Sequence, residues 1–217
     1  MTLRRFILMF ACAAALLGGK PAFALNFSEL LGGKSDLTQV QDSDMIYGDP
    51  KAPVTIIEYA SLTCPHCANF HNKVFPELAK TYIDSGKVRL VNRPFPLNEP
   101  ALKAAQLATC AGKDRYFTFI KVLYETLERW AFGDDYMNNL AQIAKVGGFS
   151  EAEFNACMMN KDIEKSILLS RKNASDQLGV NSTPTFFING KKLEGEQTIE
   201  AFKAAIDPLL PASAPAR

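Results

Sequence analysis

The chain has 217 residues, of which 47% are hydrophobic and 22% are charged, and its formal net charge at pH 7 is +1. This length and composition fit one globular domain with a sizeable hydrophobic core. Because the charge is near zero and no stretch is strongly basic, neither nucleic acid nor an anionic membrane is an expected partner.

The first 24 residues have the pattern of a secretory signal peptide. Arg4 and Arg5 form a basic start, residues 6–17 form an apolar run, and residues 22–24 (AFA) fit a small-x-small cleavage site. The apolar run is about 12 residues long, whereas a membrane-spanning helix needs about 20. We therefore expect an exported protein. Removal of the signal peptide would leave 21 basic and 23 acidic residues, a net charge of −2.

An N-terminal extension and a strand–helix–strand unit follow. Residues 25–50 are polar and rich in turn residues, with an edge strand expected near residues 45–47. The β-branched run at residues 54–60 (VTIIEYA) predicts a buried strand. A helix is expected between that strand and a second strand at residues 87–96, kinked or restarted at Pro76.

The second half of the chain predicts a helical block, a hairpin and a closing helix. Apolar residues spaced by three and four predict several helices within residues 99–178. Residues 183–190 (TPTFFING) predict a strand that ends in an Asn-Gly turn, with a hairpin partner directly after it. An amphipathic helix then precedes a tail at residues 211–217.

This order of elements predicts an α/β core with a helical insertion. Residues 51–98 and 179–210 are expected to form the core domain, and residues 99–178 a helical domain inserted into it. The right-handed crossover rule makes the first two core strands parallel neighbours, with the intervening helix on one face of the sheet.

Four cysteines remain after the signal peptide, which would remove Cys12. They are Cys64, Cys67, Cys110 and Cys157. Their even number in an oxidising compartment favours disulfides, in any of three pairings. Haem attachment would need a histidine directly after Cys67, and zinc would need a second ligand pair that the sequence lacks. No metal site is therefore expected.

The stretch SLTCPHCANFH carries the expected redox chemistry. Cys64 precedes the predicted helix start, where free backbone N–H groups and the helix dipole favour the thiolate. We expect Cys64 to be the exposed, attacking sulfur and Cys67 to resolve the mixed disulfide. Pro65 suits the first helical position, and His66 either points its ring at the Cys64 sulfur or is an exposed loop residue. His71, one helical turn after Cys67, either tunes the site or lies on the helix surface.

Three motifs resemble the DsbA family of bacterial thiol–disulfide oxidoreductases. They are CPHC at residues 64–67, GDPKAPVTIIEYAS at residues 48–61 and GVNSTPTFFINGK at residues 179–191. The resemblance covers roughly residues 45–207 and implies a thioredoxin-like fold with an inserted helical domain. It also implies a periplasmic protein that donates disulfides to unfolded or folding exported proteins with paired cysteines. Re-oxidation by a membrane quinone-linked thiol oxidase is implied in the same way, and we expect a monomer that needs no cofactor.

The resemblance assigns roles to three further residues. Glu58 is expected to end the first strand and matches the buried acid of thioredoxin-like proteins. A carboxyl in an apolar setting could accept the proton of Cys67, and the alternative is an exposed strand-end glutamate. Thr183 and Pro184 match the family's cis-proline loop, which implies that the Thr183 backbone pairs with an extended substrate segment. The alternative is an ordinary trans proline at a strand start.

Cys110 and Cys157 are expected to form a structural disulfide within the helical block. Proximity pairs the CPHC cysteines with each other, and the oxidising compartment favours a bridge over two buried free thiols. Some DsbA-like proteins resemble this chain in carrying a second bridge, whereas the simplest members lack it. Closing such a loop would stabilise the fold by about 4 kcal/mol.

Two other functions remain open from the sequence. A disulfide isomerase or reductase of the same fold is one, although isomerases usually carry a dimerisation segment and residues 25–50 lack sustained heptads. The other is a non-enzymatic periplasmic chaperone whose cysteines are only structural. The CPHC motif at a helix start argues against that reading.

Overall fold

A computed structural model describes residues 36–210, which belong to one compact unit that begins at Asp36. The expected signal peptide at residues 1–24 and the tail at residues 211–217 lie outside the described residues. No helix within the described range is long and apolar enough to cross a bilayer. In the same range, no group of three or more His, Cys, Asp and Glu residues is arranged to hold a metal ion.

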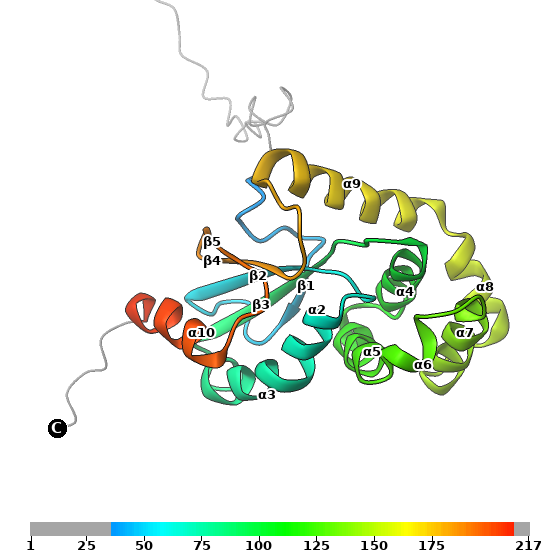
Figure 1. Cartoon of the computed structure of the whole chain (residues 1–217), viewed down its shortest axis with the longest axis horizontal. Coiled ribbons are helices and arrows are strands. Elements are labelled where there is room, and N and C mark those ends of the chain that lie inside the picture. The colour runs from blue at the N-terminus through cyan, green and yellow to red at the C-terminus, as the bar shows by residue number, and fades with distance from the viewer. Residues whose placement is uncertain (1–35, 211–217) are drawn as a thin grey trace, which may run out of the picture. The chain divides into compact units, whose positions relative to one another are not determined.

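Within the described residues, a five-stranded mixed sheet forms the centre of the fold (Figure 1). Its two middle strands, β2 and β3, are parallel neighbours, as the crossover rule predicts. The other strands each pair antiparallel with their inner neighbour. All seven residues of β2 are buried, in agreement with its β-branched sequence. Across the sheet the strands are β1 (Met45–Tyr47), β3 (Val88–Pro94), β2 (Val54–Ala60), β4 (Thr185–Ile188) and β5 (Lys191–Glu194).

The hairpin between β4 and β5 turns at Asn189 and Gly190, whose φ angles are 44° and 85°. A two-residue turn with both φ angles positive matches the twist of the strands, and Asn-Gly adopts it readily. The Asn189 side chain also accepts a hydrogen bond from the Thr55 backbone N–H at 2.8 Å. The turn is therefore tied to β2, which holds the edge of the sheet against the central strand.

The helix that begins in the CPHC motif is continuous but contains two π-helical turns. In the first π-helical turn the Phe75 N–H bonds to the Phe70 carbonyl, five residues back instead of four. The expected restart at Pro76 is present, because this proline stands in the first turn of α3, where its missing N–H is not needed. The segments are α2 (Pro65–Asn69), η1 (Phe70–Val74), α3 (Phe75–Leu78) and η2 (Ala79–Ile83).

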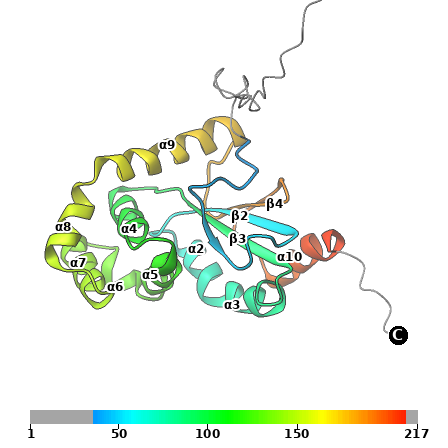
Figure 2. The same ribbon diagram turned by 180° about the vertical axis from the view of Figure 1, so that it is seen from behind.

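A block of helices is inserted between β3 and β4. Figures 1 and 2 show it beside the sheet, with α9 running back towards β4. Leu107, Leu123 and Trp130 are buried in its core, and the same cluster includes Cys64 and Cys67, so the block packs against the two cysteines of the CPHC motif. The helices are α4 (Glu99–Cys110), α5 (Lys113–Glu125), α6 (Leu127–Trp130), α7 (Tyr136–Val146), α8 (Glu151–Met159) and α9 (Lys161–Leu178).

Helices cover both faces of the sheet (Figure 2). One face packs against the helix that follows CPHC and against α10 (Ile199–Ile206), with Ile56 and Phe202 in the shared core. The other face packs against the end of α9, with Ile57 and Ala174 in the shared core. This alternation along β2 follows from the two-residue period of a strand.

The described part of the N-terminal extension packs on the core and is not a free arm. Arg93 on β3 forms an ion pair with Asp44 at 2.7 Å, with only 5% and 6% of the two side chains exposed. Arg93 also donates to the carbonyls of Leu37 and Gln39 and to the Tyr59 hydroxyl. All five N–H groups of this guanidinium therefore have partners. Arg93 therefore holds the extension in place, because moving the extension away would leave the buried guanidinium charge without its partners.

Candidate active site

The two cysteines of CPHC lie where β2 leads into α2. Cys64 is the N-cap residue of α2 with an extended backbone, and Pro65 begins the helix. Both thiols are free. Cys64 is only 5% exposed, so the prediction of an exposed sulfur is wrong, because the segment at Thr183 lies 3.3 Å from that sulfur. Cys67 is less accessible still, at 0%.

The pKa of the Cys64 thiol is lowered from about 9 to about 5. The largest cause is a hydrogen bond from the Cys67 thiol; the Thr183 hydroxyl and the backbone N–H groups of Cys67 and His66 add to it, against the opposing effect of burial. As a thiol, Cys64 donates to the Thr183 carbonyl, and the Thr183 hydroxyl is buried with no partner among residues 36–210. Ionisation of Cys64 gives that hydroxyl an acceptor.

Cys67 is shifted in the opposite direction. Burial raises the pKa of the Cys67 thiol well above its usual value, and the interactions with Cys64 and with the charge on Glu58 raise it further. At neutral pH, Cys64 is therefore a thiolate and Cys67 keeps its proton. One sulfur is ready to attack or leave, and the other must exchange a proton whenever the disulfide forms or breaks.

The His66 ring contacts Glu196 and makes no hydrogen bond to the Cys64 sulfur. Its Nδ1 lies 2.6 Å from Glu196 Oε2, and both side chains are exposed. The hydrogen bond and the charge of Glu196 raise the pKa of His66, whereas Cys64 is the smallest cause. The direct contribution of His66 to Cys64 is a hydrogen bond from its backbone N–H, which lowers the pKa of the Cys64 thiol. The sequence did not point to Glu196, since one exposed glutamate 130 residues away carries no local pattern.

Glu58 is completely buried within β2, which spans residues 54–60 as predicted, so the expectation that Glu58 ends the strand is wrong. Its two carboxyl oxygens lie 2.9 and 3.1 Å from Nε2 of His71, and it accepts a hydrogen bond from the Asn92 amide at 2.9 Å. His71 is itself only 8% exposed. The exposed alternatives for Glu58 and His71 are therefore both wrong, and the two residues form a buried pair.

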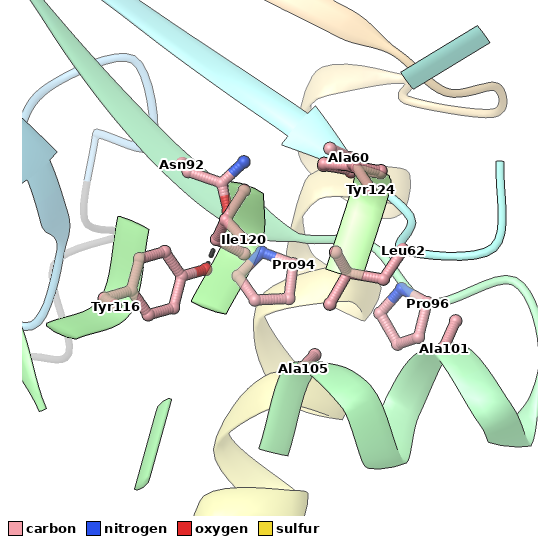
Figure 3. A pocket seen from close by; sticks show the side chains of 10 residues that line it. All are labelled: Ala60, Leu62, Asn92, Pro94, Pro96, Ala101, Ala105, Tyr116, Ile120 and Tyr124. Atoms are coloured by element: carbon pink, nitrogen blue, oxygen red, sulfur yellow. Dashed lines mark hydrogen bonds between the residues drawn. The ribbon is translucent and has the colours of Figure 1, made fainter. Parts of the chain in front are cut away.

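Tyr116 on α5 extends this network. Its hydroxyl donates to Asn92 Oδ1 at 2.7 Å, and Figure 3 shows the two side chains meeting at a cavity of about 10 Å³ that Tyr124 also lines. Burial raises the pKa of both tyrosines well above the usual value, so both stay neutral. Asn92 was not among the predicted site residues, although a polar residue on the same strand face as the apolar Val88 and Leu90 was an available signal.

Two further predicted features are present in the structure. The peptide bond between Thr183 and Pro184 is cis, directly before β4. Cys110 at the end of α4 and Cys157 on α8 form a disulfide with Cα atoms 6.1 Å apart. This bridge joins two helices of the inserted block and leaves the CPHC pair to itself. The substrate contact predicted for the Thr183 backbone stays a prediction.

Comparison with known proteins gives the class of the molecule. A family model described as thioredoxin matches residues 40–208, so the chain belongs to the thioredoxin family and the predicted fold class is confirmed. A Rickettsia conorii protein provisionally named protein-disulfide oxidoreductase RC0029 is 35% identical over 173 residues. The match covers 79% of this chain and 62% of that relative, so this chain spans less than two thirds of its length.

Comparison with solved structures shows which members of the thioredoxin family this chain is similar to. The crystal structure of Wolbachia pipientis alpha-DsbA1 matches with a TM-score of 0.74 and 36% identity, over 78% of this chain and 92% of that one. Within the thioredoxin family, this protein is therefore DsbA-like. BdbD from Bacillus subtilis, at 21% identity and a TM-score of 0.67 over 77% of this chain and 92% of that one, shares the fold.

Proposed function

We propose that this protein is a thiol–disulfide oxidoreductase that donates its Cys64–Cys67 disulfide to other proteins. The observation that carries the proposal is the placement of the two thiols, with Cys64 at the N-cap of α2 beside Thr183 and Cys67 completely buried, which shifts their pKa values in opposite directions. A Cys64 pKa of about 5 lies about two units below pH 7, which stabilises the reduced form by about 3 kcal/mol, or about 60 mV for two electrons. A stabilised reduced form makes the disulfide a ready oxidant.

The exchange proceeds in two displacements. A substrate thiolate attacks the Cys64 sulfur, a new S–S bond forms, and the bond to Cys67 breaks with its electron pair going to Cys67. A second substrate thiolate then attacks the substrate sulfur of this mixed disulfide. Cys64 leaves as a thiolate, and it leaves readily because its pKa is low. The substrate loses two electrons and gains a disulfide, while the protein becomes the dithiol.

The substrate segment is proposed to lie along the loop at Thr183. The Thr183 carbonyl is 3.3 Å from the Cys64 sulfur, which supports a substrate cysteine entering at this point. Backbone groups at the start of a strand can pair with an extended peptide without selecting its sequence. Such binding suits a donor that acts on many proteins with paired cysteines.

The proposed setting extends beyond the site itself. We infer periplasmic location from the signal-peptide pattern, exported proteins as substrates, and a membrane thiol oxidase as the source of new disulfides. The displacements use only the two cysteines, so we propose a monomer without a cofactor. Residues 51–98 and 179–210 would act as the core domain, with residues 99–178 as its insertion.

The redox equilibrium with glutathione tests the proposal. We expect the CPHC pair to stay reduced in mixtures that leave an ordinary structural disulfide oxidised. The oxidised protein should transfer one disulfide per molecule to a peptide with two cysteines. Cys64→Ser and Cys67→Ser should each abolish transfer, because neither variant can form the disulfide. With a peptide that already carries a disulfide, Cys67→Ser should accumulate the mixed disulfide, since it has no second thiol to attack the Cys64 sulfur.

A CPHC disulfide that resists reduction by glutathione would make the donor function wrong. Light scattering adds a second criterion, because a dimer that reshuffles scrambled disulfides would favour the isomerase.

A further inference from the structure

The short connector between β5 and α10, residues 195–198, carries the carboxylate that contacts the CPHC motif. At its start, the Gly195 N–H donates a hydrogen bond to the Pro184 carbonyl at 2.9 Å, and the φ angle of Gly195 is 80°, which glycine adopts without strain. At its end, the Thr198 side chain caps α10. Both ends of the connector are therefore fixed, and Glu196 lies between them.

Contacts around the reactive sulfur form a closed circuit that includes this connector. The Cys64 sulfur lies 3.3 Å from the Thr183 carbonyl oxygen, and the next residue along the chain is the proline to which the connector is bonded. On the other side, Oε2 of Glu196 lies 2.6 Å from Nδ1 of His66, whose backbone N–H bonds to the Cys64 sulfur. Glu196 is therefore linked to Cys64 from two sides, through the proline loop and through His66.

The His66 ring has Glu196 as its main partner. The hydrogen bond and the charge of Glu196 raise the pKa of His66, and Cys64 has the smallest effect on it. An imidazolium that pairs with a carboxylate has much of its positive charge balanced there, so its attraction for a nearby thiolate is weaker. The Cys64 thiolate is stabilised instead by the Cys67 thiol, then by Thr183 and by backbone N–H groups.

We propose that Glu196 is a positioning residue that holds the His66 ring away from the Cys64 sulfur, an inference that rests on the proposed donor function. When Cys64 leaves the mixed disulfide as a thiolate, the imidazolium stays paired with Glu196. A ring released from Glu196 would offer the thiolate a charged N–H donor and stabilise the reduced form further. Glu196 thus limits how strongly oxidising the CPHC disulfide is.

Thiolate absorbance of the dithiol form across acid pH tests this role. Glu196→Gln keeps the length of the side chain and removes its charge, and it should lower the pKa of Cys64 by about 0.3 units. The released ring is charged in this range, because an ordinary histidine titrates near 6.5 and Cys64 near 5. Glu194→Gln, which alters a neighbouring carboxylate that pairs with Lys192, should match the natural protein.

The equilibrium with glutathione at pH 6, where an ordinary imidazole is still mostly charged, gives a second measurement. Glu196→Gln should shift it about twofold towards the dithiol, in step with the change in the Cys64 pKa. The disulfide form has no Cys64 thiolate, so urea denaturation of that form should not distinguish the variants, since solvent screens the exposed pair.

A double variant separates an action through the ring from a direct one. In a His66→Gln background, Glu196→Gln should change the pKa of Cys64 less than half as much as in the natural background, because no imidazolium is there to be released. Equal shifts in the two backgrounds would mean that the carboxylate acts on Cys64 directly, and they would overturn the positioning role.

The outcomes also separate this inference from the proposed function. A Cys64 pKa that stays unchanged or rises in Glu196→Gln overturns the inference and leaves the donor function standing. A natural CPHC disulfide that resists reduction by glutathione overturns the donor function, and with it the role of Glu196 in setting the strength of the oxidant.

Discussion

Two neighbouring pairs on the central strands place buried charge on opposite faces of the sheet. Glu58 lies opposite Asn92, and Tyr59 lies opposite Arg93. Since side chains alternate along a strand, the first pair faces η1 and α5 and the second faces the N-terminal extension. Both faces therefore bury ionisable groups at adjacent positions of the same two strands.

The difference between these faces lies in the partner of the charge. The Arg93 guanidinium has all five donors engaged and faces the fixed carboxylate of Asp44. Glu58 instead faces the His71 ring, whose Nε2 lies 2.9 Å from Oε2 of Glu58. Burial alone does not mark a reactive site. The Arg93 charge, with every donor engaged, holds structure together, whereas Glu58 acts on Cys67, a thiol that must gain or lose a proton in each exchange.

The largest effect on the free energy of unfolding is expected at the ion pair between Arg93 and Asp44. Asp44→Ala leaves the buried Arg93 charge without its carboxylate and should lower the free energy of unfolding by about 3–5 kcal/mol. Asp42→Ala changes an exposed carboxylate in the same segment and should stay within about 0.5 kcal/mol. Urea denaturation measures both. Equal losses in the two variants would show that Arg93 does not depend on Asp44.

A smaller effect on the free energy of unfolding is expected from the Cys64 thiol. The folded pKa of Cys64, about 5, lies below the unfolded value of about 9, so its contribution to stability is present above pH 9 and is lost as the pH falls through 5. The free energy of unfolding of the dithiol form, relative to Cys64→Ser, should therefore fall by about 2 kcal/mol between pH 7 and pH 5.

Denaturation at several pH values, with the disulfide form as control, checks this slope. The disulfide form has no Cys64 thiol to titrate, so its free energy of unfolding should not show this fall between pH 7 and pH 5. A dithiol form that keeps a constant advantage over Cys64→Ser down to pH 5 would contradict the low pKa.

The smallest effect is expected at the exposed pair of His66 and Glu196. Glu196→Gln removes the charge that raises the pKa of His66, so the titration midpoint of that imidazole should fall towards its ordinary value. Glu194→Gln, which alters a carboxylate that pairs with Lys192, should leave the midpoint unchanged. Histidine resonances report both. Unfolding should be unaffected in either variant, since solvent screens exposed pairs.

Local patterns in the sequence were sufficient for most of the fold. The β-branched run, the Asn-Gly turn and the glycine-bounded helices each depend on neighbouring residues, and the structure has these elements where they were expected. The CPHC motif likewise carries its chemistry within four residues. The insertion was visible because its apolar spacing changes from that of strands to that of helices.

The contacts that complete the site could not be predicted in the same way. Arg93 and Asp44 are 49 residues apart, and nothing in the extension marks Asp44 as the buried partner. Glu58 reaches His71 only because the strand and the helix fold against each other. His66 turns towards Glu196 because a distant loop brings a carboxylate within 2.6 Å. Each of these depends on tertiary structure, which sets distances that local patterns do not contain.

The π-helical turn η1 makes the helix after CPHC sensitive to chain length. An α-helix rotates by about 100° per residue, and η1 contains one residue more than an α-helical turn would need. Deletion of a single residue here would restore α-helical spacing and keep the orientation of Cys67 relative to α3, whereas a deletion in a regular α-helix would rotate its two ends by about 100°. Exposed positions such as Lys73 should accept exchange of one side chain for another, and the same stretch should tolerate the loss of one residue better than the gain of one.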